Sequence, residues 1–467
     1  MADAGVRIRG ALPFVLAILL WLIPVPAGLT VSAWHLFAIF AAAISAVLLG
    51  AFPLLTSTML AVAAVVLTNT ASVAKIFSGF ANPSVLLVVV SFLIAQAVLK
   101  SGLGRRISLL MVSRFGSSPL GIAYALVFTD AVIAPAFPSN TARGGVLFPI
   151  VLSVSQGVGS HPHDPKGRRL GGYLMFCSMS SLAVSSALWM TATSANPIGT
   201  QLVREFGLQI GFGKWLMVSS VPAIIAILAL PWFVAKLFPP GIGHTPDAPI
   251  SARKDLIALG PMSRDEWITA IVFSLMVTCW ILGDTLGLNA AIVAVGGFGI
   301  LLITNVLTTN DIVSYGDALT TFLWLASLFA ISGQLNELGF MGYVGQYLAS
   351  YLHGLSWPVI YVTLIFTYVA IHYLFVSQSS HVLALLAVFL EVGVREGVPL
   401  ALMAFALLFA SSYFSVITPQ GGSQNVIFVG AGYLTQGELY KLGLLTTMLF
   451  FAIFMVIGSL WALLLLG

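Results

Sequence analysis

Long apolar runs separated by short polar segments dominate the pattern of this chain. Runs near 11–30, 33–50 and 52–70 each have about the 20 apolar residues that a helix needs to cross a bilayer. From Trp267 the same plan is repeated, and it ends in an apolar run from about Leu442 to Leu466. At about 20 residues a span, the pattern predicts an all-α polytopic membrane protein with about 11 transmembrane helices.

Polar residues interrupt one apolar region at positions 134–145. Two prolines, the run Ser139, Asn140 and Thr141, and Arg143 stand there between apolar arms. Lipid cannot satisfy backbone groups freed by such a break, so the break must face protein or a water-filled cavity. A helix that restarts there offers N–H groups beside hydroxyl and amide side chains, which suits an anionic solute. The alternative is a proline kink in an ordinary spanning helix.

The chain contains an internal repeat. Three pairs of segments follow in the same order at a nearly constant offset: 79–102 with 316–339, 126–129 with 364–367, and Ser139-Asn140-Thr141 with Ser377-Gln378-Ser379. A looser pair is 193–196 with 422–425. These ordered correspondences predict two structural repeats.

The basic residues are distributed unevenly between the repeats. Of the 19 Lys and Arg residues, 17 lie between Arg7 and Arg264. Glu337 stands in the second repeat where the first has Lys100. Because cytoplasmic loops gather Lys and Arg, this difference favours two inverted repeats over parallel ones. The basic residues before the first apolar run, without a cleavage site after it, predict a cytoplasmic N-terminus.

Polar segments divide the chain into four parts. We expect N-terminal scaffold helices in 1–78, a first repeat in 79–238, an inter-repeat linker in 239–266 and a second repeat in 267–467. The linker is the longest polar stretch of the chain, so it is the natural connection between the repeats.

Four interrupted places are candidates for a shared binding site near the bilayer midplane. Hydroxyls and amides there can donate to a carboxylate without placing a net charge in the bilayer. The candidates are Ser139, Asn140 and Thr141; Ser377, Gln378 and Ser379; Thr193 and Asn196; and Thr418. Each alone could be a helix-capping turn, and the repeat is what favours a site.

Two ionisable side chains near the breaks have several possible roles. Arg143 could neutralise a bound carboxylate, supply a positive field to the cavity, or pair structurally with Asp130, because an intramembrane Arg is costly unless it is paired or solvated. His381 follows the second break. It could donate to the substrate or be a packed, hydrogen-bonded core histidine.

Composition excludes several functional classes. Residues are 59% hydrophobic and 7% charged, a balance that no soluble core needs. Neither an HExxH, a GxSxG nor a Walker pattern is present, so an enzyme or an ATP-driven pump has no motif to support it. The net charge of +4 is carried by loops rather than a basic domain, and we expect no nucleic-acid partner and no cofactor.

The residues of the breaks resemble the signatures of a known family. Pro138 to Gly145, followed by Phe148-Pro149-Ile150, resembles the signature of the divalent anion:sodium symporter family. The segment from Ser377 to Val382, the ending Gly430 to Tyr433 and the linker from Leu259 to Ser263 resemble its branch of bacterial citrate, succinate and tartrate antiporters and plastidic dicarboxylate translocators. The similarity extends from about 50 to 460.

The resemblance implies a carrier for di- or tricarboxylates of the succinate, malate, tartrate, citrate and 2-oxoglutarate class. It implies a homodimer in a bacterial inner membrane, with a scaffold part and a moving transport part, as in elevator-type carriers. It also implies two re-entrant hairpins, assigned to 79–105 and 316–342. Both polar signatures, Ser139 to Thr141 and Ser377 to Ser379, would then bind the substrate carboxylates.

The chain departs from the family pattern where sodium would be held. The resemblance implies that symporters of the family hold sodium with the Asn of both signatures. The corresponding residues here are Asn140 and Gln378. The usual Thr-His-Tyr segment of the branch is replaced here by Thr418-Pro419-Gln420. Gln is longer than Asn, so a cage of oxygens for a small cation would change. With the fixed charge of Arg143, this favours sodium-independent exchange. Sodium-coupled symport and an anion channel remain as alternatives.

Overall fold

Every regular element is helical in the residues that the computed structural model describes, namely 2–162, 164, 167–375 and 377–466. Nine helices within these residues are long and apolar enough to cross a membrane. Shorter apolar helices add four more candidates: Gly10–Leu22, Leu54–Leu67, Ala290–Ile303 and Leu400–Val416. The prediction of an all-α polytopic membrane protein is confirmed.

The chain forms two compact units that interleave along the sequence. Unit 1 comprises Met1–Val89, Pro197–Gln209 and Gly316–Leu407, and unit 2 comprises Val90–Asn196, Ile210–Tyr315 and Leu408–Gly467. Each unit takes residues from both sequence repeats. The compact units are therefore not the linear segments 79–238 and 267–467, because packing partners come from distant parts of the chain.

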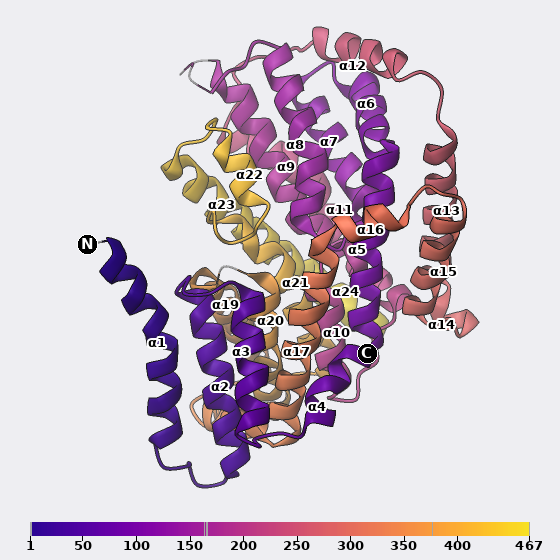
Figure 1. Ribbon diagram of the computed structural model, residues 1–467. Helices are drawn as coiled ribbons and strands as arrows, with labels where there is room; N and C mark the ends of the chain where they lie inside the picture. The colour runs from indigo at the N-terminus through magenta and orange to yellow at the C-terminus, as the bar shows by residue number, and fades with distance from the viewer. Residues whose placement is uncertain (1, 163, 165–166, 376, 467) are drawn as a thin grey trace. The chain divides into compact units, whose positions relative to one another are not determined.

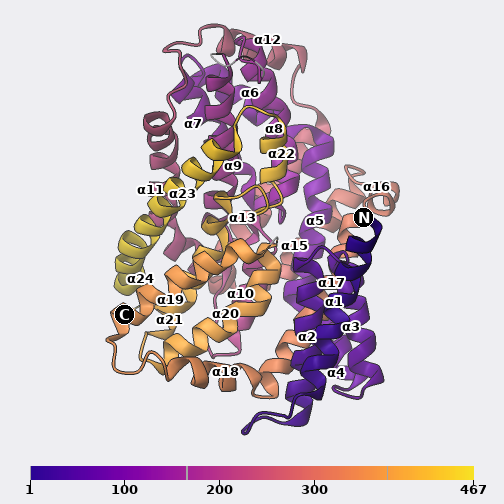
Figure 2. The ribbon, with the colours of Figure 1, turned by 90° about the vertical axis from the view of Figure 1, so that its left-hand side faces the viewer.

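Unit 1 consists of the first helices and a later helical group. Its helices are α1 (Ala2–Leu22), α2 (Val31–Leu48), α3 (Leu54–Leu67), α4 (Val73–Phe77), the 3₁₀ turn η1 (Ser78–Ala81), α17 (Gly316–Glu337), α18 (Phe340–Ala349), α19 (Trp357–Ile371), η4 (His372–Leu374) and α20 (Gln378–Arg395). Helix α17 packs on α2, α3 and α4, and α18 packs on α20. Figure 2 shows α18, α19 and α20 in orange.

Unit 2 is built around a helix that is buried on all sides. Every residue from Leu170 to Leu188 of α9 (Arg168–Leu188) is buried. The elements of the unit besides α9 are α6 (Leu103–Phe115), α7 (Pro119–Ile133), η2 (Ala134–Ala136), α8 (Asn140–Gly157), η3 (Met190–Ala192), α11 (Phe212–Leu237), α12 (Asp247–Ala258), α13 (Arg264–Ile281), α14 (Gly283–Leu286), α15 (Ala290–Ile303), α16 (Thr309–Ser314), η5 (Phe414–Val416), α22 (Asn425–Gly430), α23 (Gln436–Ala452), the π-helical η6 (Ile453–Gly458) and α24 (Ser459–Leu466). Helix α9 packs on α7, α8, α11, α22, η2, η3 and η5. Helices α5 (Pro83–Ser101), α10 (Ala195–Arg204) and α21 (Leu400–Tyr413) run from one unit into the other.

Helices α7 and α8 form a hairpin whose turn carries the first polar motif. One apolar cluster contains Leu103 at the start of α6, Ile133 at the end of α7 and Phe137 in the turn, and Val146 of α8 packs against it. At the opposite ends, the Ser117 carbonyl before α7 accepts from the backbone of Thr245, next to α12. Figure 1 shows α6, α7 and α8 beneath α12.

The hairpin expected at 79–105 is therefore found at 119–157 instead. Helix α5 is 19 residues long, enough to span by itself, and α6 starts after the left-handed Gly102 (φ 78°). Gly102 bends the chain between these helices, and α6 lies above α5 in Figures 1 and 2. In the second repeat, Gly339 (φ 79°) similarly separates α17 from α18, and α19 packs against α20 around the second motif.

The structure shows the internal repeat at the level of single elements. Helix α7, η2 and α8 contain 15, 3 and 18 residues, and α19, η4 and α20 contain 15, 3 and 18. Both second arms begin with a Ser cap in extended conformation, Ser139 (φ −139°) and Ser377 (φ −128°). Opposite insertion of the two repeats stays a prediction.

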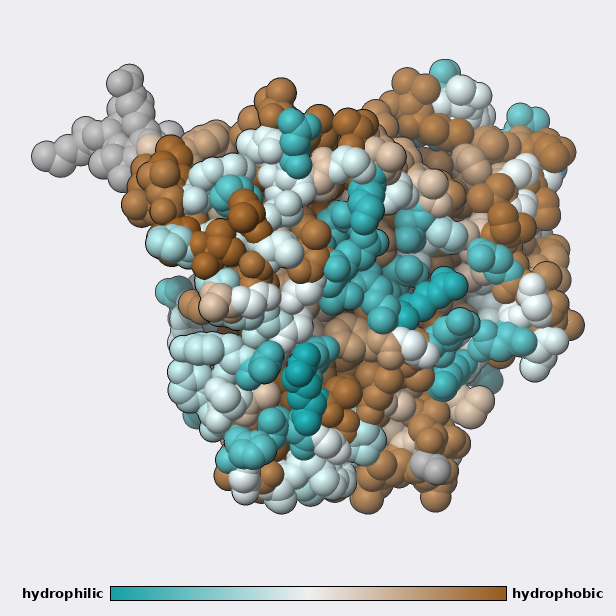
Figure 3. All heavy atoms as spheres, turned by 90° about the horizontal axis from the view of Figure 1, so that it is seen from below, coloured by the Kyte–Doolittle hydropathy of each residue, from teal (hydrophilic) through white to brown (hydrophobic). Residues whose placement is uncertain are grey.

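Large apolar side chains cover much of the outer surface. Exposed examples on several helices include Leu19, Trp232, Leu275, Phe366 and Leu464. Figure 3 shows apolar side chains over much of one face, with hydrophilic ones among them. Exposed apolar side chains in such number are typical of a protein that is surrounded by lipid.

Candidate functional site

The first motif begins helix α8 at the turn of the hairpin. Ser139 caps the helix, and its Oγ accepts from the backbone N–H of Ala142 at 3.3 Å. Local sequence explains this start, because Pro138 cannot continue a helix and Ser is a preferred N-cap. The first backbone N–H groups of α8 therefore point out of the helix end beside Asn140 and Thr141, where a helix favours negative charge.

A buried ion pair holds this helix start against α7 and α9. Arg143 Nη1 donates to Asp130 Oδ1 at 3.0 Å and to Ser185 Oγ at 2.6 Å. Its Nη2 donates to Ser186 Oγ at 2.6 Å and to Asn140 Oδ1. Both members of the pair are 0% exposed. The cluster keeps its charges balanced, as buried ions require.

In this structure Arg143 therefore pairs with Asp130, which is one of the three roles expected from the sequence. Its two terminal nitrogens are engaged by protein acceptors, including the Leu182 carbonyl at 3.0 Å. The guanidinium fixes the amide of Asn140, which also accepts from Ser186 at 2.8 Å. Direct contact of Arg143 with a bound anion stays a prediction.

The break after α9, which contains Thr193 and Asn196, lies against the turn of the hairpin. The Ser194 N–H donates to the Pro138 carbonyl at 3.0 Å, and Thr191 Oγ1 donates to the Pro135 carbonyl at 2.9 Å. Asn196 Nδ2 donates to the carbonyls of Ser186 (2.7 Å) and Trp189 (3.1 Å). Thr193 is buried beside them. Both breaks therefore belong to one hydrogen-bonded assembly.

The loop 417–425 brings a third break to the same place. Thr141 Oγ1 and Ser423 Oγ lie 2.6 Å apart. Asn425 Nδ2 donates to the carbonyls of Ser415 (2.6 Å) and Thr418 (2.8 Å), which fixes the loop. Unit 2 thus assembles six of the expected site residues around the start of α8: Ser139, Asn140, Thr141, Thr193, Asn196 and Thr418.

Sequence reasoning missed several residues of this assembly. Ser185 and Ser186 on α9 complete the Arg143 cluster, and Ser423 bonds to Thr141. A signal existed for the serines, because Ser178, Ser180, Ser181, Ser185 and Ser186 stand in the part of α9 after Arg169, which is otherwise without charged residues. Polar side chains on a fully buried helix need partners nearby.

The second motif lies in unit 1 and has the same local design. Ser377 Oγ accepts from the Ser380 N–H at 3.3 Å, and Gln378 and Ser379 open α20. His381 is buried, with its Nδ1 3.2 Å from Nδ1 of His372 and its ring edge-on to Tyr368. The histidine is therefore a packed, hydrogen-bonded residue here, and donation by it to a substrate stays a prediction.

A family model extends over almost the whole chain. Residues 8–467 match the model described as the sodium:sulfate symporter transmembrane region. The chain belongs to the divalent anion:sodium symporter family. As a member of that family it is a multi-pass membrane transporter and not an enzyme.

Relatives in this family include members of the branch that the motifs resemble. The chain is 36% identical to a spinach chloroplastic dicarboxylate transporter over 444 residues, which cover 94% of this chain and 79% of that protein. It is 30% identical to the citrate/succinate antiporter of Escherichia coli over 467 residues, 96% of either chain. It is also 36% identical over 446 residues to YflS of Bacillus subtilis, named for malate transport, with 95% and 93% covered.

Solved structures of membrane transporters share the fold of this family member. MtrF of Neisseria gonorrhoeae superposes with a TM-score of 0.58 over 98% of this chain and 94% of its own, at 16% identity. The YdaH transporter of Alcanivorax borkumensis gives a TM-score of 0.57 over 83% and 87%, at 13% identity. At such identities the similarity concerns the fold alone.

Proposed function

We propose that this family member exchanges di- or tricarboxylates across a bacterial inner membrane, independently of sodium, by elevator-type alternating access. The names of its relatives support the substrate class, since they are given as dicarboxylate, malate and citrate/succinate carriers. Succinate, malate, tartrate, citrate and 2-oxoglutarate fall within the proposal.

The observation that carries this proposal is the donor-rich, uncharged start of α8. Asn140 and Thr141 open the helix, and the loop with Ser423 lies against it. Gln424 has its Cβ next to Gly144 of α8 and its side-chain amide next to Gly422. This amide is buried, and neither its nitrogen nor its oxygen has a hydrogen-bond partner within the described part of the chain. Such groups can donate to a carboxylate while Arg143 stays neutralised by Asp130.

The hydrogen bonds that Asn140 accepts support exchange without sodium. Its Oδ1, the oxygen that a sodium ion would need, accepts from Arg143 and Ser186. A cation placed there would displace these donors and meet the guanidinium charge at short range. If sodium is used after all, Asn140 and Gln378 are the residues to test.

Two further elements complete the proposed mechanism. Ser377, Gln378 and Ser379 would bind the other end of the anion, using a helix start of the same design as that at Ser139. His381 and Arg143 would then hold the two motifs in shape. Elevator movement requires a part that stays fixed in the membrane, and we expect a homodimer to provide it, with a cytoplasmic N-terminus.

Counterflow into proteoliposomes tests the proposal. Vesicles loaded with unlabelled succinate, malate or citrate should take up the labelled anion equally with and without sodium, and empty vesicles should take up little. Asn140→Ala should abolish this uptake, whereas Asn310→Ala, an exposed substitution on α16, should leave it unchanged.

The alternatives give different results in the same vesicles. Uptake into empty vesicles that requires a sodium gradient would identify a sodium-coupled symporter. Conductance without saturation would identify an anion channel. If no carboxylate of the panel shows saturable counterflow, the proposed substrate class is rejected.

A further inference from the structure

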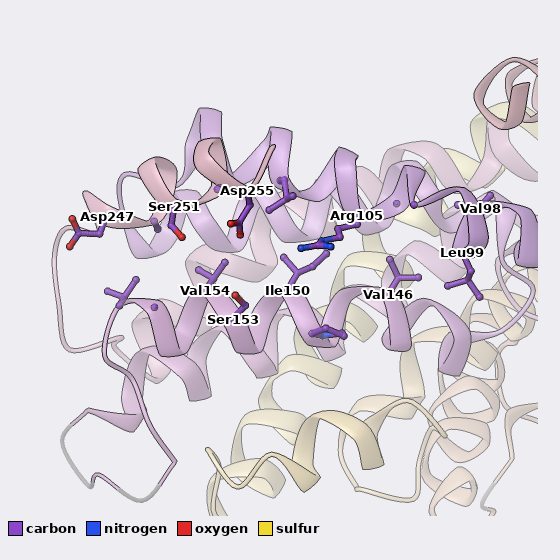
Figure 4. A pocket seen from close by; sticks show the side chains of 18 residues that line it. Val98, Leu99, Arg105, Val146, Ile150, Ser153, Val154, Asp247, Ser251 and Asp255 are labelled. Atoms are coloured by element: carbon purple, nitrogen blue, oxygen red, sulfur yellow. The ribbon is translucent and has the colours of Figure 1, made fainter. Parts of the chain in front are cut away.

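A cavity of about 400 Å³ lies in unit 2, away from the polar motifs. It is lined by α6, α8, α12 and the end of α5, and apolar side chains such as Val146, Ile150 and Val154 form one wall. Its volume falls within the range of about 300–1,000 Å³ that is usual for small-molecule sites. Figure 4 shows its lining.

Charged side chains of both signs line this cavity without pairing. Arg105, Asp247 and Asp255 face it, and within the described ranges no ion pair or side-chain hydrogen bond is formed by any of them. The neighbouring Arg106, in contrast, donates to Glu266 at 2.6 Å and to the Gly260 carbonyl at 2.9 Å. Arg106 thus fastens the linker to α6, while Arg105 is left available to a ligand.

The charges follow an order along the cavity. In Figure 4, Asp247 lies at one end, Asp255 and then Arg105 follow, and Val98 and Leu99 lie at the other end. A molecule that fits this order has a cationic group, then an anionic group, then an apolar chain. Phosphatidylethanolamine has these three parts in this sequence: ammonium, phosphate and acyl chain.

The outer face of α12 is suited to the membrane surface, where such a lipid is found. Ile250 and Ile257 are 67% and 73% exposed and lie seven residues apart, on one side of the helix. Arg253 and Lys254, between them in sequence, are exposed as well. Exposed apolar residues with basic ones beside them are typical of a helix that lies in the headgroup region.

We propose that the cavity between α6, α8 and α12 binds a phosphatidylethanolamine molecule. Arg105 binds its phosphate, Asp255 and Asp247 accept hydrogen bonds from its ammonium, and the acyl chain lies toward Val98 and Leu99. The two carboxylates disfavour a purely anionic lipid, and they select a primary ammonium over choline because choline has no N–H to donate. The bound lipid ties the linker helix α12 to the first hairpin.

Lipid binding by the delipidated full-length protein tests this proposal. Native mass spectrometry with equal amounts of phosphatidylethanolamine, phosphatidylcholine and phosphatidylglycerol should show phosphatidylethanolamine bound preferentially. Thermal unfolding in the same mixtures should show the largest rise of Tm with this lipid.

Substitutions separate the two halves of the headgroup. Asp247→Asn with Asp255→Asn should remove the preference over phosphatidylcholine, and Arg105→Gln should weaken binding of all phospholipids at least several-fold. Arg114→Gln, an exposed substitution on the same helix as Arg105 but outside the cavity lining, is the matched control and should change neither. Equal binding of the three lipids by the wild type, preference for phosphatidylglycerol, or a preference that survives the double substitution would overturn the proposal.

Discussion

Asn196 and Asn425 make the same pair of hydrogen bonds at two different breaks. Each side-chain Nδ2 donates to the carbonyl oxygens ten and seven residues earlier, Ser186 and Trp189 for Asn196, and Ser415 and Thr418 for Asn425. These carbonyls stand where a helix has ended, so they lack part of their helical partners. The loose sequence match between 193–196 and 422–425 thus reflects one structural device used twice.

Replacing either asparagine should open its break. Asn196→Ala or Asn425→Ala leaves buried carbonyls without a donor, at about 1–3 kcal/mol for each group left unsatisfied. We expect a lower Tm and a reduced rate of carboxylate counterflow for both variants, measured on purified protein and in proteoliposomes. Asn310→Ala is the control, and variants that match it in both measurements would show that the shared bonds do not hold the breaks.

The Arg143–Asp130 pair should show strong energetic coupling. Arg143→Met leaves Asp130 buried without its partner, and Asp130→Asn does the same to the guanidinium, so each single change should cost about 3–5 kcal/mol of stability. The double variant should be less destabilised than the sum of the two singles. The free energy of unfolding in detergent is measured for the wild type, both single variants and the double variant. If the losses of the two single variants add up to that of the double variant, the pairing is contradicted.

The hydroxyl of Thr141 should matter more than its methyl group. Thr141→Val removes the hydrogen bond with Ser423 Oγ, worth about 0.5–1.5 kcal/mol, so we expect KM for the transported anion to rise about two- to tenfold. Thr141→Ser keeps the hydroxyl, so its KM should stay within about twofold of the wild-type KM. Equal KM values for the Val and Ser variants would show that the hydroxyl does not act.

Glu205 should make stability depend on pH near neutrality. Partial burial, together with the nearby charge of Glu337, raises the pKa of Glu205 to about 7, although Asn336 Nδ2 donates to the carboxyl at 2.7 Å. The folded protein therefore holds this proton more tightly than the unfolded chain, whose Glu has a pKa of about 4.3. The stabilising effect is complete below that value and is lost as pH rises through about 7.

Thermal unfolding between pH 5 and 8.5 tests this expectation. Glu205→Gln should weaken the decline of Tm toward alkaline pH, because an amide cannot ionise. Asp317→Asn, which replaces an exposed acid of the same unit, should leave the pH profile unchanged. Identical profiles for wild type and Glu205→Gln would assign the titration to another group.

The breaks themselves were predictable because their causes are local. At the first break, Pro138 cannot continue a helix and Ser139 caps the next one. The second break has no proline, and the Ser377 cap is its local cause. The repeat was also visible in the sequence, and the structure gives its two copies equal element lengths of 15, 3 and 18 residues.

The position of the hairpins was not decided locally. The family resemblance placed hairpins at 79–105 and 316–342, ranges that contain the left-handed Gly102 and Gly339. The first hairpin instead folds back near Phe137, which shares an apolar cluster with Leu103. A glycine permits a bend of any size, and only contacts with distant residues determine whether the following helix continues or returns.

The sequence by itself determined the helical membrane class, the family and the polar breaks, since hydropathy, caps and prolines act over a few residues. Tertiary structure alone decided the hydrogen-bond partners of Arg143 and the assembly of three breaks in unit 2. The sequence left Arg143 three possible roles, of which pairing with Asp130 was one. Burial beside α9 selected Asp130, Ser185 and Ser186, because a charge that has lost its water must be balanced by the groups packed around it.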